Sequence, residues 1–310
     1  MDGGMSEFWI HLNAFKWLQR NRNHSQVLPT CQTERYLNTV FFFQSTLSLT
    51  TDCSFVPVQW PVDNQRSAEL CDALYRTPAM DDSCLQNTYG VTRELVVFIH
   101  VVAVLFQSVS YYASRNCKLP QTLEQTLATL SRRLDAWDIE SDRSLLADST
   151  ATARLMKLHI LAFSHALQVF HLTHLVFPIH GRALNASGIS LSAILEPHVS
   201  QVSSILLMIE DIKQENPNML GRRVAPILWP GFIASCEADC NSREAWIQWW
   251  ERMVAYRIGN IRTLWRTVQD VWQVKDEACG RAGRGDIPLR YFFASWRGFL
   301  MDRNRRILAL

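Results

Sequence analysis

Glycine is scarce in this chain, and neither sign of charge is in excess. Only 12 of the 310 residues are glycine, which is few for an all-β protein or for one built around nucleotide-binding loops. The 31 basic residues are balanced by 29 acidic ones, for a net charge of +2. A nucleic-acid-binding surface usually brings a clear basic excess, so direct binding of nucleic acid is not expected.

The cysteine spacing and the search for catalytic motifs indicate neither a disulfide framework nor a known active site. The eight cysteines form no dense framework, and the N-terminal residues lack the basic stretch and apolar run of a secretory signal. We therefore expect an intracellular protein, nuclear or cytoplasmic, with reduced thiols. Gly-x-Ser-x-Gly, His-Glu-x-x-His and the dinucleotide fingerprint do not occur. Neither a cofactor nor a metal site is expected.

Helical periodicity dominates what is present. Apolar residues make up 48% of the chain, enough for a sizeable core, and no strand-like alternation interrupts them. The pattern predicts an all-α fold without significant sheet, a single multi-helix bundle over residues 1–310. A weak seam is expected near 115–120 or 139–149. The predicted helices span 6–18, 34–47, 64–76, 95–114, 119–137, 149–176, 189–212, 219–239, 241–253, 260–272 and 288–310.

Prolines are expected to end or bend several of these helices, because proline has no amide donor. Pro178 is predicted to end the helix that begins near 149, and Pro197 to interrupt the next one. Pro226 and Pro230 are predicted to kink the segment that follows. Asn241 is a candidate N-cap, and the glycine-rich stretch 276–286 is predicted to be a loop.

Leu95 to Ser114 is a run of twenty residues without a formal charge. It is long enough to cross a bilayer. It also contains His100 and Gln107, which are more typical of a helix at the centre of a bundle. We favour the bundle and expect no membrane attachment.

Histidines cluster in one predicted helix. His171 and His174 lie three residues apart and so share a face, and His165 precedes them in the same predicted helix. A metal site would need a third and a fourth ligand, and none is apparent. The alternatives are histidines with satisfied hydrogen bonds in a core or groove, and a proton-transfer group in a cavity, for which these three are the catalytic candidates.

Six of the eleven tryptophans fall between Ala225 and Trp272. Aromatic side chains at helical spacing are typical of core packing. The functional alternative is an apolar pocket or a partner surface. The candidate ligand-binding residues under that alternative are Trp229, Trp246, Trp250 and Trp265.

The stretch that begins at Pro226, P-I-L-W-P-G-F-I-A-S-C-E-A, resembles the signature of the fungal-specific transcription factor regulatory domain, in the group named after the arginine-metabolism regulator. R-E-A-W-I-Q-W-W and G-N-I-R-T-L-W-R-T-V-Q-D-V-W follow in the family's order. The resemblance implies an all-helical regulatory domain. In the family this domain follows a DNA-binding binuclear zinc cluster held by six cysteines, whose Cys-x-x-Cys-x₆-Cys spacing this sequence lacks.

Two hypotheses follow. The first is a stand-alone regulatory domain without its own DNA-binding module. It would act through protein partners or as a homo-oligomer, with a small hydrophobic ligand as a further option. The second is an enzyme of secondary metabolism built from the same domain, a cofactor-independent cyclase, isomerase or dehydratase with an apolar pocket. The sequence leans towards the first.

Overall fold

A computed structural model describes residues 31–51, 80–115, 117–139, 150–188, 190–215, 227–282, 296–297 and 300. Within these ranges no strand occurs, and the predicted all-α class is confirmed. The helices predicted at 6–18 and 64–76 lie outside the described residues, as does the one predicted from Pro288 except at 296–297 and 300, which are helical. The single domain and its weak seam stay predictions.

Some of the helices begin where the sequence offers a cap or a proline. Thr150 Oγ1 accepts the Ala153 N–H at the start of α8, and Pro120 directly precedes α6. In chain order the described elements are α2 (Gln32–Thr51), α4 (Asp82–Cys84), the π-helical turn η2 (Leu85–Tyr89), α5 (Arg93–Ser114), α6 (Gln121–Asp135), α8 (Ala151–His171), the π-helical turn η4 (Leu172–Val176), α9 (Phe177–Ala186), α10 (Leu191–Glu215), α12 (Leu228–Glu237), α13 (Arg243–Ala255) and α14 (Ile261–Ala282).

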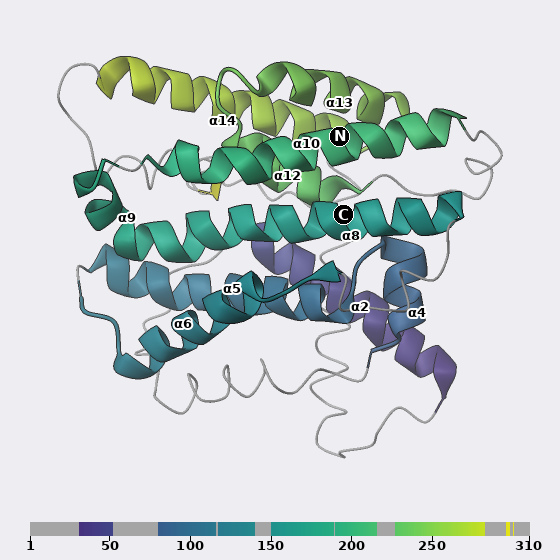
Figure 1. The fold of residues 1–310 in the computed structure, drawn as a ribbon, viewed down its shortest axis with the longest axis horizontal. Coiled ribbons are helices and arrows are strands. Elements are labelled where there is room, and N and C mark those ends of the chain that lie inside the picture. The colour runs from purple at the N-terminus through teal and green to yellow at the C-terminus, as the bar shows by residue number, and fades with distance from the viewer. Residues whose placement is uncertain are drawn as a thin grey trace.

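The long helix α8 lies at the centre of the array (Figure 1). On one side it packs against α5, which in turn packs against α2. On the other side it lies beside α10, and α9 follows at the end where the chain turns back. The short helix α12 contacts α8, α10 and α14, and α13 packs on α10 and α14. The tryptophan-rich segment thus forms one side of the bundle, with α12 as its inner face.

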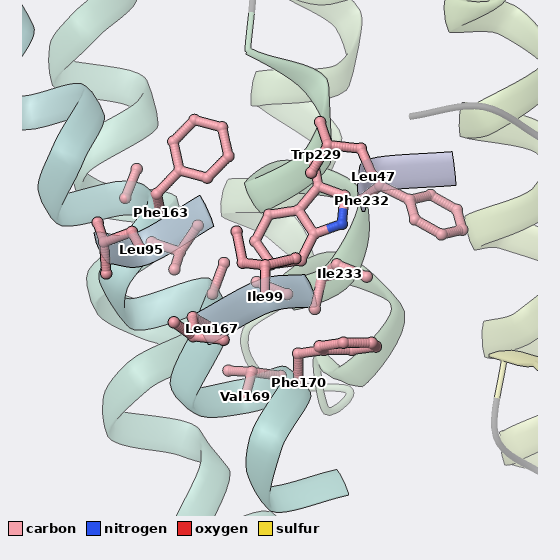
Figure 2. Close-up of a cluster of buried hydrophobic side chains, with 14 of the residues drawn as sticks. Leu47, Leu95, Ile99, Phe163, Leu167, Val169, Phe170, Trp229, Phe232 and Ile233 are labelled. Atoms are coloured by element: carbon pink, nitrogen blue, oxygen red, sulfur yellow. The ribbon is translucent and has the colours of Figure 1, made fainter. Parts of the chain in front are cut away.

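The core is continuous across these helices. Figure 2 shows Trp229 and Phe232 of α12 among side chains from α2, α5 and α8, including Leu47, Ile99 and Phe163. The Trp229 indole stacks on Phe163 at a centroid distance of 5.7 Å and an interplanar angle of 11°. Because aromatic rings bury large areas and pack in preferred geometries, these contacts fix the position of α12 against α8.

Helix α5 contains the charge-free run Leu95–Ser114 identified in the sequence. By length and composition alone, Arg93–Tyr112, Ala151–Gly181 and Leu191–Glu215 could each cross a membrane. In the fold α5 contacts α2, α6, α8, η4 and α9, and Phe98 on it is fully buried. This packing agrees with the bundle-centre alternative. The expected absence of membrane attachment stays a prediction.

Gly90 precedes α5 in the left-handed region, with φ of 61°. A Cβ atom at this position would lie 2.5 Å from both Cβ and Nδ1 of His159 on α8. Only glycine fits this position. Other residues are strained at positive φ, and their Cβ atom would clash with His159. Gly90 therefore sets how closely the start of α5 approaches α8.

Two prolines do not act as predicted. The helix continues past Pro178, which is the second residue of α9, and α10 is continuous through Pro197. Ahead of Pro178 the η4 turn is wider than an α-helical turn, and the Phe177 N–H donates to the Leu172 carbonyl five residues back. A π-helical turn of this kind absorbs a proline without ending the helix. Burial of the apolar face of α10 outweighs the hydrogen bond that Pro197 lacks.

Three predictions near α12 are also wrong in detail. Pro230 does not kink the helix: it is the third residue of α12, where an amide has no intrahelical acceptor. Pro226 lies outside the described residues. Asn241 is not the cap of α13. Instead the Asp239 carboxylate accepts the backbone N–H groups of Asn241 and Ser242. The part of the predicted loop from 276 to 282 is instead helical, because α14 continues to Ala282, and residues 283–286 lie outside the described part of the chain.

Candidate functional site

The segment that carries the family resemblance is α12, and it is buried on every side. All residues from Leu228 to Cys236 are buried. A helix that is apolar all round is placed in a core because no polar face remains to meet water. The short length of ten residues makes α12 dependent on its neighbours, since an isolated helix of this size is not stable.

Gly231 lets α13 approach α12 at this point. The position that a Cβ would occupy is taken by the outer edge of the Trp249 indole ring. Any larger residue would have to displace a fully buried tryptophan. The glycine in the signature is therefore explained by close helix packing rather than by a ligand.

The polar atoms of α12 are used inside the protein. The Trp229 Nε1–H donates to Thr50 Oγ1 at 2.9 Å. The Trp250 Nε1–H donates to Ser235 Oγ at 3.2 Å, and the Trp272 Nε1–H donates to the Ser235 carbonyl at 2.7 Å. A buried indole N–H needs a partner, so each of these bonds ties a neighbouring helix to α12.

Lys275 of α14 completes the end of α12. Its Nζ donates to the Cys236 carbonyl at 2.7 Å and to Glu237 Oε2 at 2.6 Å. A cation at a helix C-terminus satisfies exposed carbonyls and complements the helix dipole. The Ser-Cys-Glu part of the signature thus holds α14 in place.

The candidate ligand-binding tryptophans lie in ring-to-ring contacts. Trp246 and Trp249 meet edge to face, as do Trp249 and Trp250, with centroid distances of 6.0 and 4.8 Å. Trp250 stacks on Trp265 at 5.7 Å. Trp229, Trp246 and Trp250 are fully buried, whereas Trp265 is half-buried. These contacts are typical of core packing, which is the alternative to an apolar pocket or a partner surface.

The three candidate histidines do not converge on one centre. His171 Nε2 lies 3.1 Å from Ser131 Oγ of α6. His174 belongs to η4, donates from Nδ1 to the Phe170 carbonyl at 3.0 Å and packs against Phe106. His165 instead faces His198 of α10, a residue that sequence reasoning did not single out. Their separation results from the helical turns between them and from the different neighbours of each face.

Burial lowers the pKa values of these histidines. Desolvation lowers the pKa of His171 to about 4 and that of His174 well below its usual value, with the Arg297 charge adding to the effect. For His165 the cause is burial and then the neighbouring His198. Because a general acid or base works best with a pKa near the working pH, His171 and His174 are poorly matched to proton transfer at neutral pH.

A buried ionic cluster lies where α8, α10 and the end of α13 meet. Lys213 Nζ and Glu210 Oε1 are 2.8 Å apart, with side chains only 2% and 7% exposed. The Tyr256 hydroxyl donates to Glu210 Oε2 at 2.6 Å, and burial together with this carboxylate raises the tyrosine pKa. Burial, and then the charge of Lys213, lowers the pKa of His159 to about 3.

Sequence reasoning missed this cluster because a Glu and a Lys three apart on a helix are ordinary on a solvated face. Only the packing of the helices shows that both are buried. A pair of this kind contributes little net stability, since desolvation offsets the attraction, but removing one partner is costly.

An open groove of about 490 Å³ runs between α10 and the start of α13. Its lining is polar: Ser200, Ser203, Asn241 and the carboxylates of Glu196 and Glu244 contribute to it. Burial, and then the charge of Asp239, raises the pKa of Glu196. None of the candidate tryptophans or histidines lines this groove. In the described part of the chain no three His, Cys, Asp or Glu side chains come close enough together to hold a metal ion.

Comparison with known proteins identifies the class of this fold. Residues 1–309 match the family described as "Fungal specific transcription factor domain". The chain belongs to that family, which supports a role in regulating transcription, and the resemblance read from the α12 segment is confirmed.

A particular relative is "Arginine metabolism regulation protein II" of Saccharomyces cerevisiae, 20% identical over 199 residues. The match covers 62% of this chain and 21% of the relative, so the chain spans about a fifth of that protein's length. No solved structure matches the chain.

Proposed function

We propose that this chain is a nuclear regulatory domain that controls transcription through protein partners and does not itself read DNA. The family match over residues 1–309 supports the regulatory part. The absence of a six-cysteine zinc-cluster pattern from these 310 residues and the net charge of +2 support the second part.

The observation that carries the proposal is the position of the family signature. Helix α12 is buried against α8, α10 and α14, and its polar atoms are bonded to neighbouring helices. A signature of this kind specifies a rigid scaffold rather than a reaction centre. A scaffold acts through the surfaces that it presents, which is the mode expected of a regulatory domain.

The enzyme alternative has less support in the described residues. His165, His171 and His174 meet different partners, so no acid–base constellation is assembled from them. The small apolar ligand stays a prediction. Three of its four candidate tryptophans are fully buried in ring contacts, which leaves Trp265 as the accessible one.

A reporter assay tests the regulatory role. The chain is fused to a heterologous DNA-binding module, and transcription of a reporter that carries the matching site is measured in yeast. We expect the fusion to change transcription several-fold relative to the module alone. Gly231→Leu should abolish the change because it displaces Trp249, whereas Gly259→Ala should preserve it because no atom lies within 4 Å of the new Cβ position.

The claim about DNA is tested with the isolated chain. Fluorescence anisotropy with duplex DNA libraries at a salt concentration of about 150 mM should show no sequence-specific binding. Specific binding by the isolated chain would overturn that part of the proposal. A folded, nuclear fusion that leaves reporter transcription unchanged would overturn the regulatory part.

A further inference from the structure

Two histidines from different helices face each other where α8 and α10 pack together. His165 of α8 and His198 of α10 have their Nδ1 atoms 3.2 Å apart. Their ring centroids are 5.5 Å apart and the rings are inclined at 45°. Helices α8 and α10 lie side by side (Figure 1), and 33 residues separate the pair in sequence.

The distance between the two nitrogens suits a shared metal ion. Zinc binds histidine nitrogens at about 2.0–2.1 Å with tetrahedral angles, which places two such nitrogens roughly 3.3 Å apart. The observed separation is close to that value. A direct hydrogen bond between the rings is the competing explanation, and it requires one Nδ1 to carry a proton and the other to accept it.

The surroundings of the pair favour a cation with open coordination positions. Both side chains are half-buried rather than enclosed, so water can reach an ion bound between them. Burial lowers the pKa of each ring. The neutral imidazole is the form that binds metals, so this shift does not oppose binding.

We propose that His165 and His198 together bind a divalent transition-metal ion, Zn²⁺ in the first place, as a bridge between α8 and α10. Water would fill the remaining positions, since no third protein ligand joins the pair among the described residues. Imidazole suits zinc, nickel and copper, whereas magnesium and calcium prefer oxygen ligands. The ion would link two of the longest helices of the domain and so stabilise its folded state.

Zn²⁺ titration of the full chain tests this site. Exposed thiols such as Cys31, Cys117 and Cys240 are first alkylated, because they also bind zinc. Isothermal titration calorimetry should then show saturable binding, and Tm should rise with the logarithm of the Zn²⁺ concentration. His165→Asn and His198→Asn should each weaken the Zn²⁺ affinity by at least about tenfold. Loss of a residue that only hydrogen-bonds to a metal ligand already has an effect of this size.

His180→Asn is the matched control, because His180 is an exposed histidine on the neighbouring helix α9. It should bind Zn²⁺ as the parent does. Equal binding by all three variants, or no saturable binding by the parent chain, would overturn the proposal and leave the hydrogen-bonded pair as the explanation.

A second measurement is independent of how well the variants fold. X-ray absorption at the zinc edge of the loaded parent chain should report two imidazole nitrogens with oxygen ligands completing the shell. A spectrum with sulfur ligands, or with oxygen alone, would contradict the assignment.

Discussion

Helices α12 and α10 are both packed in the core, but they differ in what they do with polar groups. Every residue from Leu228 to Cys236 in α12 is buried, and its hydrogen bonds go to indole and lysine groups of neighbouring helices. Helix α10 buries one face and presents another. It carries the buried Glu210–Lys213 pair, His198 and one wall of the polar groove.

The recognisable family signature and the unusual titratable groups therefore lie on different helices. The sequence around α12 is distinctive because close packing of tryptophan, glycine and proline permits few residues at each position. The titratable groups with unusual surroundings lie instead on α8 and α10, in stretches without a recognisable motif. The family signature therefore marks how the domain is held together, and a search for ligands or partners should begin with α10.

The largest expected effect concerns the buried pair of α10. Glu210→Ala would leave the Lys213 charge buried without its partner, so we expect the free energy of unfolding to fall by about 3–5 kcal/mol. Asp211→Ala is the matched control one residue later. Its ion pair with Arg252 is half exposed and should contribute no more than about 1 kcal/mol. Urea unfolding monitored by circular dichroism measures both, and equal losses would show that burial of the pair is unimportant.

The second test addresses the packing of α12. Gly231→Ala places a Cβ where the Trp249 ring lies, and we expect a loss of about 1–3 kcal/mol, as for other overpacked cores. The loss should appear although alanine is favoured over glycine within helices by about 1 kcal/mol. At Gly259 the added Cβ meets open space, so Gly259→Ala should change stability by no more than about 0.5 kcal/mol. A stabilised Gly231→Ala variant would refute the close approach of α13.

The third test uses pH. The pKa values of His159 and His171 are lowered to about 3 and about 4, so the unfolded chain binds protons that the folded one does not. Stability should be constant above pH ~6.5 and fall as the pH decreases from there towards ~4, by up to about 1.4 kcal/mol per pH unit for each such histidine.

Urea midpoints measured across that pH range provide the check. His171→Gln should reduce the slope, whereas His180→Asn should not, because His180 is exposed. A slope that is the same in all three chains would place the pH dependence elsewhere in the protein.

Much of the fold could be predicted from periodicity. The helices at 34–47, 95–114, 119–137 and 260–272 were expected and are present as α2, α5, α6 and α14. The bounds of the first three differ by at most four residues, whereas α14 continues to Ala282, well past the predicted end. Prolines were the main source of error. Pro178 and Pro197 were expected to break helices that continue through them, because the π-helical turn η4 and the burial of α10 outweigh the local preference.

The candidate site was predicted less well. The tryptophans were identified, and their packing interpretation agrees with the ring contacts of Trp246 and Trp250. The pairing of His165 with His198 could not be predicted, since nothing in the local sequence relates residues on two helices. The burial of Lys213 could not be predicted either. A lysine three residues after a glutamate is common on solvent-exposed helix faces, so the spacing does not distinguish a buried pair from an exposed one.

By itself the sequence determined the helical class and the family, because apolar spacing selects helices and the crowded α12 segment admits few alternatives. The tertiary structure alone decided which polar groups meet and which are withdrawn from water. Those outcomes depend on contacts between residues far apart in the chain, such as Trp229 with Thr50 and His165 with His198. Burial and the neighbouring charges then set the pKa of each group, and both exist only once the helices have packed.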